Sequence, residues 1–413
     1  MTKDTKCESH TLGVRDEVLP HEFVIEVASR VKRLPPYLFG RLNQIKYEKR
    51  TQGIDIIDLG MGNPIDPTPQ PIVEKLCEAV HDSRNHRYSA NAIGIFNLRR
   101  EIAQFYEREW GVELDPSREV VCTIGSKEGL SHLFLALLEQ GDTALVPSPA
   151  FPVHLHSPAL AGAKVATIPL KEQEELLREI VKAIELERPK VLILNFPHNP
   201  TAMTVELGFF EEIVNIALKY NVIVIHDFAY CCTAFEGYHP PSFLQVNGAK
   251  EVGVEFNTMS KTFNMPGWRL GFCVGNRQII EALARIKGYY DYGLFQPVQI
   301  ASIIALRECK AHAVEQARVY QQRRDILCEG LSRAGWQIEK PRATMFVWTP
   351  IPEKYRAMGS MEFSLKLLNE AKVSVSPGVA FGKEGEGFLR FALVENELRL
   401  KQAVRQIHKA LNK

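Results

Sequence analysis

The sequence predicts an α/β protein built around a mostly parallel sheet. Short, nearly continuous apolar runs alternate with amphipathic helical segments through the middle of the chain. This alternation is typical of parallel strands that helices cover on both faces. After Gly275 the pattern changes to long helices, followed by mixed strands and helices, which predicts a smaller α+β part. The length of 413 residues allows two or three domains.

The strand-like runs of the middle region are short and rich in β-branched residues. They cover 119–124, 144–146, 164–169, 191–196, 222–226, 254–258 and 270–274. Helical spacing of apolar residues lies between several of them, at 128–138, 172–186 and 207–220. The later helices are expected at 277–287, 297–308, 312–334, 361–371 and 395–412, and the later strands at 345–348, 373–375 and 388–393.

Composition and charge exclude several classes of protein. The chain has 50 Lys+Arg against 49 Asp+Glu, which argues against nucleic-acid or polybasic membrane partners. No apolar run approaches the length of a membrane span, and the polar N-terminus shows no secretory signal. The adjacent Cys231 and Cys232 favour a reducing compartment over a disulfide framework. We therefore expect a cytoplasmic protein.

Polar residues gather where the predicted strands end. Ligands of parallel sheets bind beyond the carboxyl ends of the strands. Asn199, Asp227, Tyr230, Lys261 and Arg269 all lie at or beside such ends, in this order. Each one alone is explained by a turn, a helix cap or a solvated charge. Together, within one domain, they predict a ligand site.

The segment 260–271 reads Ser-Lys-Thr-Phe-Asn-Met-Pro-Gly-Trp-Arg-Leu-Gly. With the residues just named, it resembles the signature of the pyridoxal-phosphate-dependent class I aminotransferases, the aspartate-aminotransferase superfamily of fold type I. The resemblance runs from about residue 35 to residue 411. Through 125–129, 196–201 and 291–293, the chain is most similar to bacterial alanine (glutamate–pyruvate) aminotransferases.

The resemblance implies an organisation and a cofactor. An N-terminal arm, 1–34, would precede a large cofactor-binding domain, 63–300, and a small domain made of 35–62 plus 301–413. The cofactor would be pyridoxal 5′-phosphate, the substrates an amino acid and a 2-oxo acid, and the assembly a homodimer.

Three residues carry the catalytic roles that the resemblance implies. Lys261 would hold the cofactor as a Schiff base and then move a proton, and burial beside Arg269 should favour its neutral form. Asp227 would pair with the pyridine nitrogen and keep it protonated. Tyr230, together with Asn199, would hydrogen-bond the phenolic oxygen.

The phosphate site is expected at the N-terminus of a predicted helix. Residues 125–127 open a predicted helix, whose free N–H groups and dipole attract an anion. The resemblance puts Ser126 and Lys127 on the phosphate, with Thr258, Ser260 and Arg269 on its other side.

Two aromatic residues are assigned by the resemblance alone. Tyr88 would reach the phosphate of the neighbouring subunit, and Phe151 would stack on the pyridine ring. On composition alone, Tyr88 is explained as an interface or core tyrosine and Phe151 as core.

Substrate recognition requires a carboxylate clamp. Arg390 is a lone charge in an apolar strand, where an unpaired charge is costly unless it has a function, and its planar fork suits an α-carboxylate. Gly62 fits a loop that passes close to the substrate, and Asn199 would share in substrate binding.

The substrate preference is predicted from a difference between this sequence and the aspartate-specialised members of the family. Aspartate-specialised relatives hold the distal carboxylate with a second arginine from the partner subunit, whereas the matching stretch 289–296 is aromatic and has none. This favours alanine with 2-oxoglutarate, although a positive group for a distal carboxylate could come from elsewhere, for example from Arg33 or Arg41.

Other activities stay open at this point. Aspartate or LL-diaminopimelate transamination, or a β-eliminating lyase, fits the same fold. A non-catalytic cofactor-binding regulator conflicts with the intact Lys261, and a nicotinamide dehydrogenase lacks its glycine fingerprint. His154 and His156 are a weak metal-ligand pair, so no metal is expected.

Overall fold

The computed structural model of the protein describes residues 24–36, 38–89 and 91–412. The chain divides into a compact unit that ends at Pro35 and a second that begins at Pro36. In the first unit, the described residues form the single-turn helix α1 (Ser29–Lys32), which buries no side chain. The predicted polar arm falls largely on residues 1–23, outside the described residues. The second unit contains two sheets.

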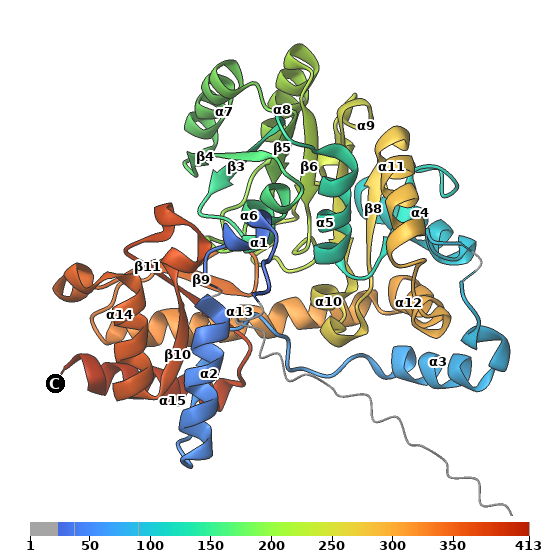
Figure 1. The fold of residues 1–413 in the computed structure, drawn as a ribbon. Coiled ribbons are helices and arrows are strands. Elements are labelled where there is room, and N and C mark those ends of the chain that lie inside the picture. Colours follow the sequence, from blue (N-terminus) through green and yellow to red (C-terminus); the bar gives the residue numbers. More distant parts are fainter. Residues whose placement is uncertain (1–23, 37, 90, 413) are drawn as a thin grey trace, which may run out of the picture. The chain divides into compact units, whose positions relative to one another are not determined.

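The larger sheet has seven strands in the order β2-β8-β7-β6-β5-β3-β4 (Figure 1). Its strands are β2 (Val120–Thr123), β3 (Thr143–Ser148), β4 (Lys164–Pro169), β5 (Val191–Leu194), β6 (Ile223–Asp227), β7 (Gly253–Thr258) and β8 (Gly271–Gly275). All neighbours pair in parallel except β8, which runs antiparallel to both β2 and β7. The predicted mostly parallel sheet is therefore confirmed.

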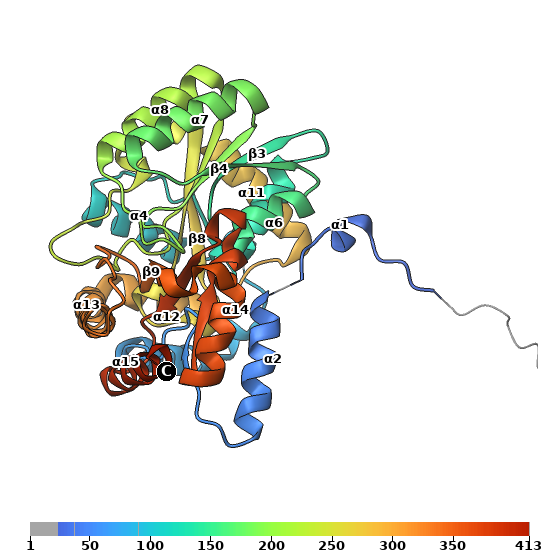
Figure 2. The same cartoon turned by 90° about the vertical axis from the view of Figure 1, so that its left-hand side faces the viewer.

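Helices cover both faces of this sheet. The helices of this part of the chain are α3 (Gln70–His81), α4 (Phe96–Trp110), α5 (Ser126–Leu137), α6 (Pro152–Leu160), α7 (Gln173–Glu187), α8 (Leu207–Tyr220), α9 (Ala249–Val252), α10 (Met259–Thr262), α11 (Arg277–Tyr290) and α12 (Gln296–Glu308). Successive strand side chains enter two different cores: Leu192 packs with α4, α7 and α8, and Ile193 packs with α5, α6 and α11. Figure 2 shows α7 and α8 side by side.

The smaller sheet has the order β1-β10-β11-β9. Its strands are β1 (Ile57–Leu59), β9 (Phe346–Pro350), β10 (Val373–Pro377) and β11 (Phe388–Ala392), and the helices α2 (Leu38–Thr51), α13 (Lys310–Arg333), α14 (Gly359–Lys366) and α15 (Glu397–Leu411) belong to the same parts of the chain. β1 pairs in parallel with β10, so residues before the large sheet complete a sheet made mostly from residues after it. The domain boundaries at residues 63 and 300 remain a prediction.

A buried carboxylate fixes the strand ends that matter most for the site. Glu255 on β7 is fully buried and accepts a hydrogen bond from the Tyr106 hydroxyl at 2.8 Å and from the Ser242 hydroxyl at 2.9 Å. Its other oxygen accepts from the Phe243 amide and contacts Nδ1 of His226 on β6, both at 2.8 Å. Both carboxylate oxygens of Glu255 therefore have hydrogen-bond partners. The network holds β6 against β7 near their carboxyl ends, where the site residues lie.

Two observations bear on the compartment and on membranes. The cysteines that the structure describes are all free thiols. No helix in the described ranges has both the length and the apolar character that crossing a membrane requires.

Candidate active site

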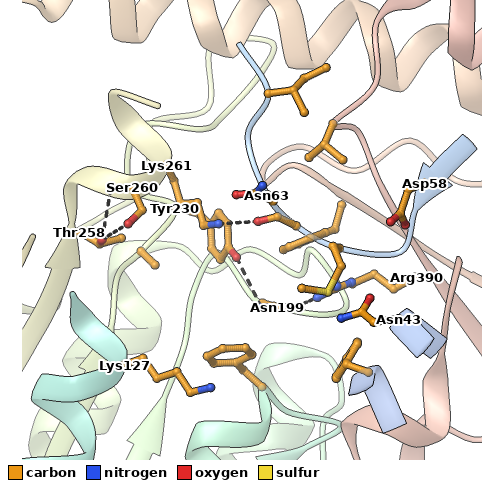
Figure 3. Close-up of a pocket in the computed structure, with 18 of the residues that line it drawn as sticks. Asn43, Asp58, Asn63, Lys127, Asn199, Tyr230, Thr258, Ser260, Lys261 and Arg390 are labelled. Carbon is orange, nitrogen blue, oxygen red and sulfur yellow. Dashed lines mark hydrogen bonds between the residues drawn. The ribbon is translucent and has the colours of Figure 1, made fainter. Parts of the chain in front are cut away.

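A cavity of about 910 Å³ lies at the carboxyl ends of β5, β6 and β7 (Figure 3). All the predicted site residues except one line it: Gly62, Ser126, Lys127, Phe151, Asn199, Asp227, Tyr230, Thr258, Ser260, Lys261, Arg269 and Arg390. Tyr88 does not line it. Its side chain is 88% exposed and its ring meets that of Tyr292 edge-on, with centroids 5.8 Å apart.

Lys261 enters the cavity from the short helix that follows β7. The Thr258 hydroxyl caps this helix by accepting a hydrogen bond from the Ser260 amide at 3.2 Å. The Lys261 ammonium donates to the Gly62 carbonyl at 2.6 Å. Burial, and then the positive charges of Arg390 and Arg269, lower the pKa of Lys261 to about 8. The lysine is thus close to giving up its proton at neutral pH.

Asp227 is the last residue of β6 and is buried. One carboxylate oxygen, Oδ2, lies 3.0 Å from Nε2 of His154. The other, Oδ1, is buried and has no hydrogen-bond partner among the described residues. Because buried carboxylate oxygens are rarely left unpaired, this atom marks a place for a ligand N–H group.

Arg390 projects from β11 into the same cavity. Its Nη1 donates to Oδ1 of Asn199 at 2.7 Å, and its Nη2 donates to the Gly60 carbonyl at 3.0 Å. In the described part of the chain no carboxylate forms an ion pair with it, and its Nε has no partner. Burial lowers the pKa of Arg390 to about 10. A buried, unpaired guanidinium of this kind is a binding site for an anion.

Two further contacts fix the geometry around this arginine. The guanidinium lies over the Phe346 ring, 4.0 Å from its centroid. The Asn199 amide donates to the Tyr230 hydroxyl at 3.4 Å, so Asn199 connects the arginine to the tyrosine (Figure 3). Burial raises the pKa of Tyr230, which keeps the hydroxyl protonated.

An anion cradle lies at the start of α5. Gly125 has φ +73° and directly precedes Ser126, the first residue of the helix. A Cβ at Gly125 would lie 2.4 Å from Nη2 of Arg269, so only glycine lets this guanidinium approach the helix start. Free helix N–H groups, an arginine and the hydroxyls of Thr258 and Ser260 therefore meet at one end of the cavity.

Comparison with known proteins identifies the family. Residues 54–407 match the profile of the family "Aminotransferase class I and II". The chain belongs to the class I and II aminotransferases. It is 50% identical over 381 residues to the glutamate-pyruvate aminotransferase AlaC of Escherichia coli K12, covering 92% of each chain. It is also 44% identical to the LL-diaminopimelate aminotransferase of Moorella thermoacetica, covering 94% of this chain and 99% of that relative.

Solved structures agree with this assignment. Substrate-bound BacF from Bacillus subtilis superposes with a TM-score of 0.89 at 36% identity, covering 94% of this aminotransferase and 98% of BacF. The protein is therefore a transaminase of fold type I that depends on pyridoxal 5′-phosphate and acts on an amino acid and a 2-oxo acid.

The cavity fits this cofactor. The cradle at Gly125 and Ser126 suits a phosphate, the unpaired Oδ1 of Asp227 suits a protonated ring nitrogen, and Lys261 has a lowered pKa. These features arise from the chain itself, in separate parts of the cavity.

Sequence reasoning missed two positioning residues of the aminotransferase site. Asn195 lies just after β5. Its side-chain oxygen accepts a hydrogen bond from the backbone N–H of Asn199 at 2.9 Å, and its side-chain NH₂ donates to the backbone carbonyl of Asp227 at 2.6 Å. His154, interpreted only as half of a weak metal pair, contacts Asp227 instead. Asn195 could have been found by the strand-end rule, whereas the contact of His154 depends on how α6 packs.

One of the two suggested extra cations needs correction. Arg41 is exposed and does not line the cavity, whereas Arg33 belongs to the first unit of the chain and stays a prediction. The helix α2 instead supplies Lys46 and Arg50, which lie 2.6 Å and 4.0 Å from Oδ2 of Asp58. The spacing on α2 places these two residues, rather than Arg41, toward the cavity.

One cluster away from the cavity could hold a metal ion. It consists of Glu128, His132 and Asp291. The fully buried ammonium of Lys287 lies 3.3 Å from Glu128 and 2.9 Å from Asp291. A lysine therefore already balances these carboxylates, and the cluster is explained as a salt-bridge network.

The lowered pKa of Lys261 gives a pH prediction. In cofactor-free protein the neutral amine should be the minor form below pH about 8 and the major form above it. Competitive acetylation at a series of pH values, followed by peptide mass spectrometry, should show half-maximal reactivity of Lys261 near that pH. In Arg390→Leu one positive charge is removed, so the midpoint should move upward. A wild-type midpoint above pH 10 would contradict this prediction.

Proposed function

We propose that the protein exchanges the amino group of alanine with 2-oxoglutarate, giving pyruvate and glutamate. The observation that carries this proposal is the stretch 289–296, which has no arginine for a distal carboxylate and exposes Tyr289, Tyr290, Tyr292 and Phe295. The 50% identity to a glutamate-pyruvate aminotransferase supports it.

The substrate clamp in this proposal is Arg390. It binds the α-carboxylate in bidentate fashion, with Asn199 holding one edge of the guanidinium. The Gly60 carbonyl fixes the other edge, and the Phe346 ring fixes the plane. Gly62 lets the loop approach, since a Cβ there would lie 2.7 Å from Phe346.

The cofactor would be held at four points. Ser126, Lys127, Thr258, Ser260 and Arg269 bind its phosphate. Asp227, positioned by His154, pairs with the ring nitrogen. Phe151 covers the ring face, and Tyr230 and Asn199 donate to the phenolic oxygen.

Lys261 is the proposed acid–base group. The bound cofactor acts as an electron sink that stabilises negative charge at the substrate Cα. Lys261 would hold the bound cofactor, and its amine would take the proton from the substrate Cα. A pKa of about 8 suits an amine that must both accept and return a proton near neutral pH.

We also propose a cytoplasmic homodimer. Tyr88, Tyr289, Tyr290, Tyr292 and Phe295 are all about half exposed or more, which is unusual for large aromatic side chains of a monomer. A two-fold contact through them would bring Tyr88 of one subunit to the phosphate of the other. The free thiols of the described cysteines favour a reducing compartment.

A second candidate substrate is LL-diaminopimelate. Two relatives, 44% and 45% identical to this chain, are named LL-diaminopimelate aminotransferases. The α2 side of the cavity is lined by charges of both signs, Lys46, Arg50, Asp58 and Glu395, which could meet a distal group that bears an ammonium and a carboxylate. The 2.6 Å pair between Lys46 and Asp58 already satisfies two of them, so alanine is preferred here.

The substrate proposal is tested by single-turnover half-reactions. Each amino acid is mixed with the holoenzyme and the conversion of the cofactor to its amine form is followed by absorbance. Alanine should react at least about tenfold faster than aspartate or LL-diaminopimelate, which corresponds to about 1.4 kcal/mol. A faster reaction with LL-diaminopimelate would favour the second candidate, and release of ammonia would indicate a β-eliminating lyase.

The carboxylate clamp gives a second test. Arg390→Lys keeps the charge but loses the planar fork, so kcat/KM for alanine should fall about 100-fold, equivalent to about 3 kcal/mol. Arg41→Lys, at an exposed position outside the cavity, is the matched control and should leave kcat/KM unchanged. A clamp role is ruled out if the two variants behave alike.

A further inference from the structure

A second cavity, of about 610 Å³, is lined in part by residues that directly follow active-site residues in the sequence. It shares no lining residue with the first cavity. Cys231 and Cys232, which follow Tyr230, line it, and so do Thr262 and Phe263, which follow Lys261. Its walls also include the aromatic rings of Phe105, Trp110, Phe235, Tyr238 and Phe263. A volume and lining of this kind are those of small-molecule pockets.

The two thiols lie side by side in this cavity. Their Sγ atoms are 3.5 Å apart in a turn that the Thr233 amide closes by donating to the Tyr230 carbonyl at 3.0 Å. Two sulfurs that share a tetrahedral zinc at about 2.3 Å each are separated by about 3.8 Å. One thiophilic atom could therefore bridge Cys231 and Cys232 with little movement of either side chain.

The surroundings decide which thiophilic atom fits. A zinc ion needs two further ligands. The ring nitrogen on the cavity wall, Nε2 of His239, already contacts the Glu109 carbonyl at 3.2 Å, and the ring stacks on Trp110. A trivalent arsenical with one organic group needs only two sulfurs and brings an apolar substituent. The aromatic part of the wall suits that substituent, whereas the rest of the lining includes the charged side chains of Arg108, Glu109, Glu236, Arg307, Lys310 and Arg318.

We propose that Cys231 and Cys232 form a dithiol site that binds monosubstituted trivalent arsenicals, with the organic group in the second cavity. Starting from an arsine oxide, two As–S bonds form and the arsenic–oxygen bond breaks. The two thiol protons leave with that oxygen as one molecule of water. Arsenic stays trivalent, so no oxidant or reductant is consumed.

The state of the thiols agrees with this chemistry. Burial, with the neighbouring thiol, raises the pKa of Cys231 well above its ordinary value, so the sulfur is protonated at neutral pH. The Asn257 amide donates to this sulfur at 3.1 Å. Alkylating reagents require a thiolate, whereas condensation with an arsine oxide consumes both thiol protons. The buried Cys231 thiol should thus react with an arsenical and resist iodoacetamide.

Phenylarsine oxide added to the holoenzyme at one equivalent tests the site. Intact-mass spectrometry should show one phenylarsenic group per chain, two thiols should be lost from titration, and peptide mapping should place the group on Cys231 and Cys232. 2,3-Dimercaptopropanol should remove it, whereas 2-mercaptoethanol at equal thiol concentration should not. In Cys232→Ser the affinity should fall by about 100-fold or more because chelation is lost.

Cys77→Ser, which removes an exposed thiol elsewhere, is the matched control and should bind as the wild type does. The proposal is overturned if the wild type takes up no arsenic, if the group maps to other cysteines, or if Cys232→Ser binds equally well. Should Cys232→Ser not fold, the wild-type peptide map decides. Because no measurement uses the transamination reaction, failure here is independent of the substrate proposal.

Discussion

The buried Arg390 and the half-buried Lys261 line one cavity, and no carboxylate among the described residues forms an ion pair with either of them. The arrangement of the site depends on this constraint. Burial lowers the pKa of both residues, and the positive charge of Arg390 lowers the pKa of Lys261 further. Neutral groups contact them instead: the Gly62 carbonyl accepts from Lys261, and the Gly60 carbonyl and the side-chain oxygen of Asn199 accept from Arg390. The positive charges therefore favour the binding of anions in this cavity. The carboxylate of a substrate and the phosphate of the cofactor are such anions.

The fold supplies these groups from distant parts of the sequence. Lys261 follows β7 of the larger sheet, whereas Arg390 lies on β11 of the smaller one. The loop 60–62 reaches both cations because β1 joins the smaller sheet through β10. The carbonyls that hold the lysine and the arginine are therefore two residues apart, which links cofactor attachment to carboxylate recognition. Neither sheet alone could form the site.

The helix Leu207–Tyr220 could be predicted to the residue because its apolar spacing is regular and Asn221 ends it in the left-handed conformation. That Asn199, Asp227 and Lys261 line one cavity could be predicted, since strand-end polarity and the segment 260–271 are local signals. The helix α2 could not be predicted from the sequence, because its apolar pattern is weak. It packs against residues far away in the sequence, as the contact between Phe39 and Phe381 shows. The predicted helix 361–371 leaves α-helical geometry after Lys366, where a π-helical turn begins. The contact between His154 and Asp227 joins residues 73 positions apart, and no periodicity encodes it.

The most direct test of the account is the position of the cofactor on the chain. Borohydride reduction of the purified holoenzyme makes the carbon–nitrogen bond between cofactor and lysine permanent, and peptide mass spectrometry then locates it. The account predicts one phosphopyridoxyl group per chain, on Lys261, and none after prior conversion of the cofactor to its amine form by alanine. A label on Lys127 or on any lysine outside the cavity would contradict the assignment of Lys261 and the mechanism built on it.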